Sequence, residues 1–168
     1  MSGVSWSELD AWRSRGDRLS PEVLALWART RVHVWPETYL LVSLPLTQGP
    51  AAAALVAAQG AFGALVVERD EVSITVREDL WRASPLRASA RAESAPLRAL
   101  SLDLDIDLSV CGYLAPVADR LAQAGVSIVP QCAFLKDHLL IHQDQLTAAL
   151  RVLEDLVREC GGLGSRPA

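Results

Sequence analysis

The chain has 168 residues, of which 51% are hydrophobic and 21% are charged, a balance typical of one compact globular domain or two small ones. The formal net charge is only -4 and the charges are interspersed, so no basic stripe indicates a nucleic-acid partner. No apolar run approaches the roughly 20 residues that span a bilayer, and the first residues are polar where a secretory signal would be apolar. We therefore expect a cytoplasmic protein without a membrane partner.

The beginning of the chain, residues 1–29, is expected to form a helical arm. Ser20 followed by proline is typical of a helix start, because a serine side chain accepts a hydrogen bond from a free amide and proline fits the first turn. Trp6, Leu9 and Trp12 lie three residues apart and predict an earlier, shorter helix. These tryptophans either cover the flank of a domain or form a surface for a partner or a second copy.

Residues 30–82 are expected to form a first unit. A strand begins at Thr38, "AAAALVAA" is a short helix, and "AFGALVV" and "EVSITV" are strands around a turn. A short helix or turn then begins at Glu78. Residues 83–96 are poor in large apolar side chains and are expected to be a connector.

Residues 97–162 are expected to form a second unit, followed by a tail at 163–168. Apolar and polar residues alternate from Leu100 to Leu108, which predicts a strand with three aspartates on its solvated face. The helix after it places Pro116 in its first turn and stops at Gly125. The remaining pattern predicts two strands, at 126–132 and 138–141, and a last amphipathic helix that ends at Gly161 and Gly162.

The two halves thus repeat one order of elements, which is consistent with internal duplication. A strand-helix-strand-strand-helix order over about 60 residues is typical of a ferredoxin-like sheet with its helices on one face. The fold class predicted is α+β, with two ferredoxin-like βαββαβ units behind the N-terminal helical arm.

Metal and thiol chemistry find little support in the sequence. His138 and His142 lie four apart on a predicted strand, hence about 13 Å from one another, too far to share a metal easily. The three cysteines form no Cys-x-x-Cys pair and are odd in number, so we expect reduced thiols: Cys111, Cys132 and Cys160. No base is recognisable beside any of them. We expect no cofactor, no metal and no enzyme, with a thiol enzyme as an outside alternative.

From Leu97 onward, "LRALSLDLDIDLSVCGYLAPVADRLAQAGVSIV" followed by "CAFLKDHLLIHQDQLTAAL" resembles the small bacterial proteins built from paired ACT domains. Their relatives include the ACT domains of aspartate kinases and of mammalian cytosolic arginine sensors. The first half contributes "GALVVERDEVSITVRED", which looks like the hairpin of that family's first ACT unit. The resemblance implies a regulatory or sensory protein that binds an amino acid or similar metabolite, and a homodimer or a regulated partner protein.

The resemblance also implies where the ligand binds: between the loop after the first strand and a hairpin, closed by a strand of another ACT unit. Amides at the start of a helix attract a carboxylate, and Gly112 lets a ligand approach the backbone, unless it only makes a tight corner. Asp137 is the candidate partner for an ammonium group, and Phe134 with Tyr113 the candidate walls for a side chain. The predicted ligand-binding residues are Val110, Cys111, Gly112, Tyr113, Leu114, Cys132, Ala133, Phe134 and Asp137.

The hairpin departs from the family's pattern. Where relatives tend to carry Ser, Thr, Phe, Asp, Thr and Asp, this chain has "CAFLKD", so three polar groups are lost. Cysteine and alanine do not supply the hydroxyls that a polar ligand would use. We expect weaker binding, or a more apolar amino acid than the basic or hydroxylated ones. The alternative is an interaction module that keeps the fold and binds no ligand.

Overall fold

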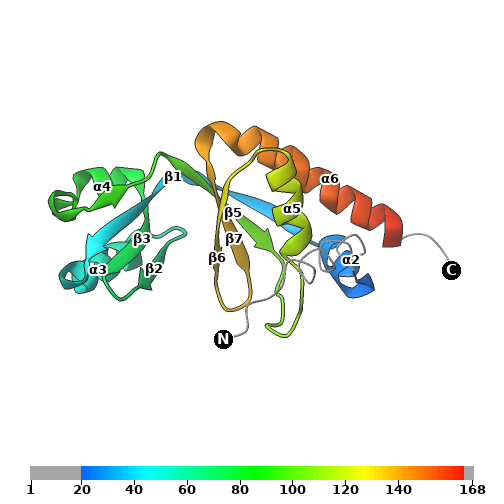
Figure 1. Ribbon diagram of the computed structural model, residues 1–168, viewed down its shortest axis with the longest axis horizontal. Coiled ribbons are helices and arrows are strands. Elements are labelled where there is room, and N and C mark those ends of the chain that lie inside the picture. The colour runs from blue at the N-terminus through cyan, green and yellow to red at the C-terminus, as the bar shows by residue number, and fades with distance from the viewer. Residues whose placement is uncertain (1–19, 165–168) are drawn as a thin grey trace, which may run out of the picture.

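One antiparallel sheet runs through the whole computed structural model, which describes residues 20–164 and side chains through Gly161 (Figure 1). The prediction of a mixed α+β protein is confirmed. In chain order the elements are α2 (Pro21–Trp27), β1 (Arg31–Pro45), α3 (Gly49–Ala58), β2 (Ala64–Val67), β3 (Glu71–Arg77), α4 (Glu78–Ala83), β4 (Ala92–Glu93), β5 (Leu97–Asp103), α5 (Ala115–Gln123), β6 (Ile128–Cys132), β7 (Asp137–His142) and α6 (Leu146–Gly164).

The sheet has the order β2-β3-β1-β5-β7-β6, and β4 pairs with β1 off this path. The long strand β1 belongs to both halves of the molecule. Its second part pairs with β3 from Tyr39 to Pro45, and its first part pairs with β5 from Arg31 to Val34. The pairing with β5 shifts register between Val34 and Thr38. Because one strand is common to both halves, their separation into two units at the predicted boundaries stays a prediction.

Three sequence-based boundaries are wrong. The first strand begins at Arg31 and not at Thr38, because residues 31–34 pair with β5 before the register shifts. The predicted strand from Leu100 to Leu108 ends at Asp103, and Leu108 is 74% exposed. The chain leaves the sheet after Asp103, and the later aspartates of the alternating pattern, Asp105 and Asp107, lie in the loop before α5. The last helix also continues past Gly161 to Gly164.

The predicted connector contains regular structure. A 3-10 helix (Pro85–Ser89) fills its first part, and β4 then pairs with β1 at Val42 and Ser43. This stretch therefore lies against the sheet of the first half.

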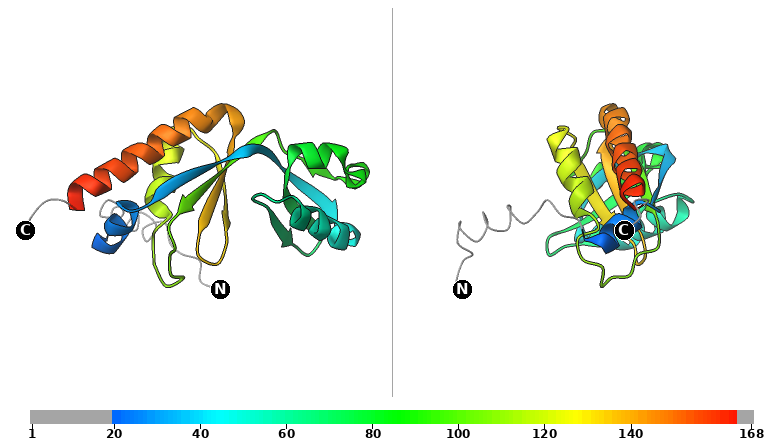
Figure 2. Two further views of the ribbon diagram at one scale, coloured as in Figure 1. Left: turned by 180° about the vertical axis from the view of Figure 1, so that it is seen from behind. Right: turned by 90° about the vertical axis from the view of Figure 1, so that its right-hand side faces the viewer.

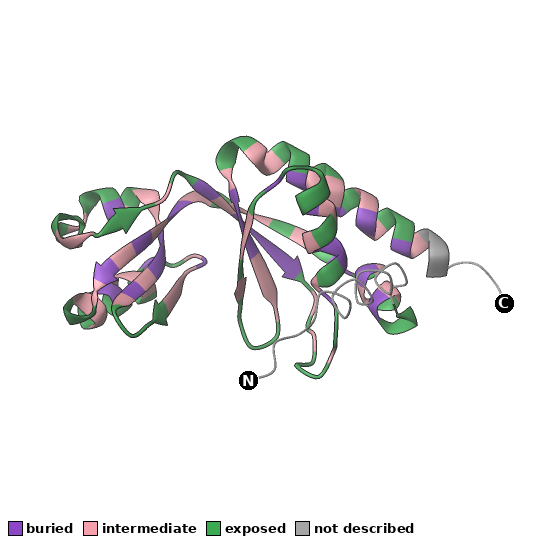
Figure 3. Ribbon diagram, in the orientation of Figure 1, coloured by how far each residue is buried: buried purple, intermediate pink, exposed green. Residues whose placement is uncertain are grey.

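The larger core lies between strands β5 and β7 and the helices that pack on them (Figures 2 and 3). Helices α2, α5 and α6 contribute buried side chains that meet Leu100, Leu102, Leu139 and Ile141 from the sheet. A smaller core in the first half gathers around Trp81, Leu40 and Ile74. Within the described residues, no helix is both long enough and apolar enough to cross a membrane.

Helix α2 starts where the sequence predicts, since Ser20 Oγ accepts a hydrogen bond from the amide of Val23 at 3.2 Å and proline occupies the first turn. Its Trp27 is fully buried. The earlier helix predicted around Trp6, Leu9 and Trp12 lies outside the described residues. At the other end of the second half, α5 carries its proline in the first turn and stops before Gly125, whose φ is 70°, as expected.

Candidate ligand site

The loop between β5 and α5 meets the β6–β7 hairpin around a cavity of about 320 Å³. Eight of the nine predicted site residues line it: Val110, Gly112, Tyr113, Leu114, Cys132, Ala133, Phe134 and Asp137. Cys111 is exposed in the same loop and does not line the cavity. Six further residues line it that the sequence did not single out: Ile106, Asp107, Leu108, Ala115, Leu135 and Lys136. Whether any molecule binds here stays a prediction.

The loop is built as a turn that leaves amides free. Asp107 closes its start, because the carboxylate accepts hydrogen bonds from the amide and the hydroxyl of Ser109 at 2.8 and 2.6 Å, which lowers the pKa of Asp107. Gly112 has φ 86°, in the left-handed region that favours glycine, and a Cβ there would meet nothing within 4 Å. The glycine thus serves the turn and also leaves open space on the cavity side.

Helix α5 begins without a side-chain cap. The residue at its cap position is Leu114, whose side chain has no acceptor, and the first helical amide, that of Ala115, donates to Gly112 O at 3.2 Å. Within the described part of the chain, the amides of Gly112, Tyr113 and Leu114 have no hydrogen-bond acceptor. Uncapped amides at a helix start carry partial positive charge and favour an anionic group. The absence of a Ser, Asp or Asn cap at this helix is thus compatible with an anionic ligand.

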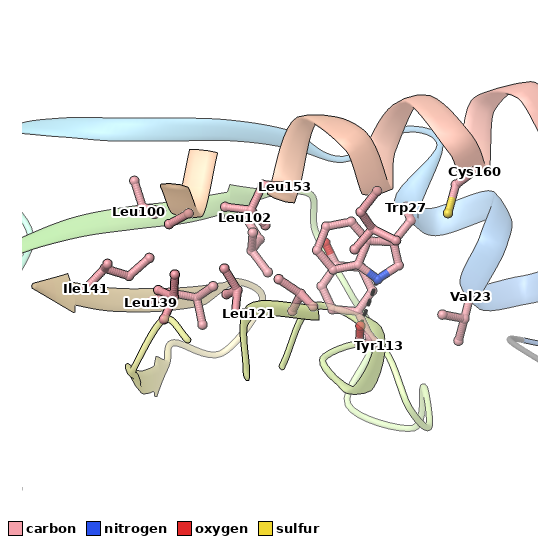
Figure 4. Close-up of a cluster of buried hydrophobic side chains, with 14 residues drawn as sticks. Val23, Trp27, Leu100, Leu102, Tyr113, Leu121, Leu139, Ile141, Leu153 and Cys160 are labelled. Atoms are coloured by element: carbon pink, nitrogen blue, oxygen red, sulfur yellow. Dashed lines mark hydrogen bonds between the residues drawn. The ribbon is translucent and has the colours of Figure 1, made fainter. Parts of the chain in front are cut away.

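Tyr113 is held by Trp27 of helix α2 (Figure 4). Its ring stacks on Trp27 with centroids 4.9 Å apart and planes 15° apart, and its carbonyl accepts a hydrogen bond from Trp27 Nε1 at 2.8 Å. Its hydroxyl is 2.7 Å from the hydroxyl of Thr30. Burial raises the pKa of Tyr113 to about 12. Tyr113 therefore presents only part of its surface to the cavity, and its hydroxyl has a partner.

The hairpin is tied to the loop by three contacts. The amide of Ile106 donates to Leu135 O at 2.9 Å, and Lys136 Nζ lies 2.6 Å from Asp103 Oδ1 and 3.6 Å from Asp105 Oδ1. The lysine hydrogen bond lowers the pKa of Asp103. Lys136 is thus engaged by two carboxylates of this chain. The tip of the hairpin leaves Phe134 76% exposed at the rim of the cavity.

Cys132 and Asp137 face one another across the hairpin as register partners. A hydrogen bond from the thiol to the Asp137 carboxylate, reinforced by burial, raises the pKa of Cys132 to about 11. The thiol is therefore protonated at neutral pH and is a poor nucleophile. Burial also raises the pKa of Cys160. These pKa directions favour inert thiols over a thiol enzyme at these two positions.

The histidines lie away from the cavity. Nδ1 of His138 is 2.7 Å from Ser101 Oγ, and its ring is 4.6 Å from that of Phe62. Burial lowers the pKa of His138 and favours the neutral ring. Among the described residues, no group of three or more His, Cys, Asp or Glu side chains is arranged to hold a metal ion.

The cavity therefore combines three features. Gly112, Tyr113 and Leu114, whose amides are free, line it from the loop before α5, and Asp137 lines it from the hairpin. Apolar residues line the rest, among them Ile106, Val110 and Leu135. Such an arrangement can hold a small molecule with a negative end, a positive end and an apolar body.

Comparisons with known proteins agree with this architecture. The family model described as "ACT domain" matches residues 94–155. A crystal structure of a protein of unknown function from Vibrio cholerae is similar at 17% identity with a TM-score of 0.62, covering 81% of this chain and 97% of that one. A protein from Agrobacterium tumefaciens is similar at 21% identity, also with a TM-score of 0.62, over 77% and 90% of the two chains.

The regulatory subunit of aspartate kinase from Thermus thermophilus, in a ligand-free form, is similar at 16% identity with a TM-score of 0.54, over 76% of this chain and 97% of that one. At such identities the likeness concerns the fold. No curated protein sequence matches this chain.

Proposed function

This chain is an ACT-domain protein, and from that premise we propose that it is a non-enzymatic regulatory protein whose cavity binds a free amino acid. The observation that carries the proposal is the convergence of the β5–α5 loop and the β6–β7 hairpin on one cavity that offers uncapped amides and a carboxylate. An α-amino acid has the two charged ends that these groups would bind, which a nucleotide or a neutral sugar lacks.

In the proposed complex the α-carboxylate lies at the amides of Gly112, Tyr113 and Leu114. These amides have no acceptor within the described residues, and the left-handed turn at Gly112 carries no side chain to obstruct them. A carboxylate at a helix start gains both hydrogen bonds and the favourable dipole.

The ammonium group lies at Asp137 in the same proposal. Asp137 is half-buried and lines the cavity, and the group nearest to it across the hairpin is a neutral thiol. Asp107 accepts two hydrogen bonds from Ser109, and Lys136 pairs with Asp103, whereas Asp137 accepts one hydrogen bond, from the Cys132 thiol. Because a carboxylate has two oxygens that both accept hydrogen bonds, Asp137 keeps acceptor capacity for a ligand cation.

The side chain of the ligand is proposed to be apolar. Ile106, Leu108, Val110 and Phe134 line the cavity, and Cys132 and Ala133 stand where relatives tend to carry hydroxyls. An apolar side chain of the ligand would cover these groups without leaving a polar atom unpaired.

The proposal extends to assembly and location. Two ferredoxin-like units, at 30–82 and 97–162, are supported by the strand orders β2-β3-β1-β4 and β6-β7-β5-β1, each of which places four antiparallel strands in the order of that fold. A homodimer would close the cavity against another copy. A cytoplasmic location fits three unpaired thiols.

A second candidate function is an interaction module without a ligand. Leu108, Phe134 and Leu135 are 74%, 76% and 45% exposed and all line the rim of the cavity. Exposed apolar side chains gathered in one place favour contact with another protein.

A thermal-shift screen with each of the twenty amino acids tests the proposal. A ligand at a hundred times its dissociation constant stabilises the native state by about 2.7 kcal/mol, which raises the melting temperature of a domain of this size by several degrees. Asp137→Asn should weaken binding at least about tenfold, since it removes a charged partner. Asp119→Asn is the matched control, because Asp119 is exposed on α5, outside the cavity lining, and bonds only Gln123.

If no amino acid shifts the wild-type protein, the amino-acid proposal fails. The interaction module is then tested by Phe134→Ser, which should change the oligomer size or the retention of a partner. If an amino acid raises the melting temperature of Asp137→Asn and of the control variant equally, the ligand binds elsewhere.

A further inference from the structure

Helix α2 contacts the site loop at Tyr113. Trp27 Nε1 donates to the Tyr113 carbonyl at 2.8 Å, the two rings stack, and Thr30 bonds the Tyr113 hydroxyl at 2.7 Å. The main chain and the end of the side chain of Tyr113 are therefore both fixed by the same N-terminal segment (Figure 4). Tyr113 lies 83 residues after Thr30, so this contact joins parts that are distant in the sequence.

The hydrogen bonds have a defined direction. Thr30 Oγ1 donates to Leu26 O at 2.9 Å, and a hydroxyl has a single hydrogen, so the Tyr113 hydroxyl is the donor to Thr30. The Tyr113 carbonyl belongs to the peptide whose amide is that of Leu114, one of the free amides at the start of α5. The indole hydrogen bond thus fixes the orientation of a peptide group at the candidate site.

Helix α2 owes its position to packing. It has seven residues, fewer than the roughly twelve at which an isolated helix becomes marginally stable in water. It is held by Val23 and Trp27, which are buried in the core formed with α5 and α6. A short helix that depends on docking can open locally without unfolding the sheet.

We propose that α2 is a clamp on the ligand-binding loop and that Trp27 is its positioning residue, holding the Tyr113–Leu114 peptide group in the orientation that a ligand carboxylate meets. The inference rests on the proposed function for the identity of the site, and it adds the regulation of that site. Docking of α2 and binding at the loop then stabilise one another, because coupling between two sites is reciprocal. Any partner or modification that displaces α2 would weaken the site.

The test compares two substitutions of the same kind in the full chain. Trp27→Phe keeps an aromatic ring against Tyr113 and removes the indole donor together with the second ring of the buried side chain. Trp35→Phe is the matched control, since Trp35 Nε1 also donates one hydrogen bond, to Ser101 Oγ at 2.8 Å, on the side of the sheet away from the loop.

Two readouts need no ligand. Hydrogen exchange followed by mass spectrometry measures the opening of residues 109–115, and iodoacetamide measures access to Cys160, which is buried in the core that α2 helps to form. Loss of one buried hydrogen bond corresponds to an opening about five- to tenfold more frequent. We expect that increase at the loop in Trp27→Phe and no change there in Trp35→Phe.

A third readout uses the amino acids of the thermal-shift screen, each at 10 mM. Trp27→Phe should reduce the largest wild-type shift, and Trp35→Phe should preserve it. If the two variants accelerate loop exchange equally, or neither does, Trp27 has only a general structural role and the clamp is wrong. If no amino acid shifts the wild-type protein, the proposed function fails while exchange and alkylation still decide whether α2 holds the loop.

Should Trp27→Phe fail to fold, Thr30→Val provides a second variant. It removes the acceptor of the Tyr113 hydroxyl and leaves the indole hydrogen bond in place. Accelerated exchange confined to residues 109–115 and to α2 supports the clamp, whereas acceleration spread evenly over the sheet overturns it.

Discussion

The hydroxyl of Tyr113 should contribute to stability in a pH-dependent way. In Tyr113→Phe the buried Thr30 hydroxyl loses its donor, at a position that is 4% exposed. Thr30 keeps its hydrogen bond to Leu26 O, but the loss of the bond that its buried oxygen accepts costs about 1 to 2 kcal/mol of the free energy of unfolding. At pH 8, where the phenol is protonated in the folded and the unfolded chain, the variant should therefore be less stable by that amount.

The difference should shrink at alkaline pH. Burial raises the pKa of Tyr113 in the folded chain to about 12, against about 10 for an unfolded tyrosine. A raised pKa means that this contribution to stability is full below pH 10 and is lost as the pH rises toward 12. At pH 11 the wild-type protein should have lost about 1.4 kcal/mol through this group, which the phenylalanine variant cannot lose.

Urea denaturation followed by tryptophan fluorescence at pH 8 and pH 11 measures the two free energies. Other groups that titrate in this range, including Cys132 and Tyr39, are common to both proteins and cancel in the difference. We expect a gap of about 1 to 2 kcal/mol at pH 8 that falls close to zero at pH 11. A gap that stays constant between the two pH values would refute the assignment of a buried, protonated phenol.

Three further predictions concern single residues. Iodoacetamide at pH 8 should modify Cys111 first and Cys132 much more slowly, as mass spectrometry would show, because Cys111 is exposed and the pKa of Cys132 is raised to about 11; equal rates would contradict the thiol–carboxylate hydrogen bond. Ser20→Ala should lower stability by about 1 kcal/mol through loss of the α2 cap, and an unchanged urea midpoint would argue against that cap. Gly112→Ala should destabilise by about 1 to 2 kcal/mol although its Cβ has room, because φ is 86°. Gly161→Ala, in the helical region of φ within α6, should instead stabilise by up to about 1 kcal/mol, and two changes of the same sign would contradict the backbone argument.

Local patterns in the sequence were sufficient to predict most of the elements from Gly49 onward. The helix after Gly49, the β2–β3 hairpin and α5 with Pro116 in its first turn follow from signals contained within a few residues. Such signals act through the backbone of one segment, so their effect needs no knowledge of the rest of the chain.

The errors in the predicted boundaries arise where the structure of a segment depends on residues that are distant in the sequence. Residues 31–37 form a strand because β5 offers them a partner, and no local pattern reveals that partner. Beyond Asp103 the alternation continues in the sequence, but the loop to α5 takes it out of the sheet, where its backbone bonds the hairpin at Leu135. An alternating sequence of apolar and polar residues thus indicates only that the segment has one apolar side. The segment forms a strand only where a neighbouring strand pairs with it.

Only part of the candidate site was likewise predicted from the sequence. The loop and the hairpin were predicted from the resemblance to paired ACT domains, and eight of the nine residues line one cavity, while ligand binding stays a prediction. The sequence did not predict that Trp27 and Thr30 contact Tyr113. The only signal in the sequence was an apolar face on α2, and an apolar face does not identify what it covers.

Strand β5 has buried side chains on both of its faces. Leu100 and Leu102 lie in the core under the helices, whereas Leu97 and Ala99 lie in a third cluster with Tyr39 and Phe62. The central strand is therefore covered on both faces, which a simple amphipathic strand would not be.

The sheet bends into an arch (Figures 1 and 2). Its two ends meet, since Gln131 Nε2 on β6 donates to Thr75 Oγ1 on β3 at 2.7 Å although β1, β5 and β7 lie between these strands. The hairpin that carries Cys132 and Asp137 is thus joined to the first half at Gln131, directly beside the candidate site. A change in the position of that hairpin would therefore disturb the hydrogen bond between Gln131 and Thr75, which joins it to the first half.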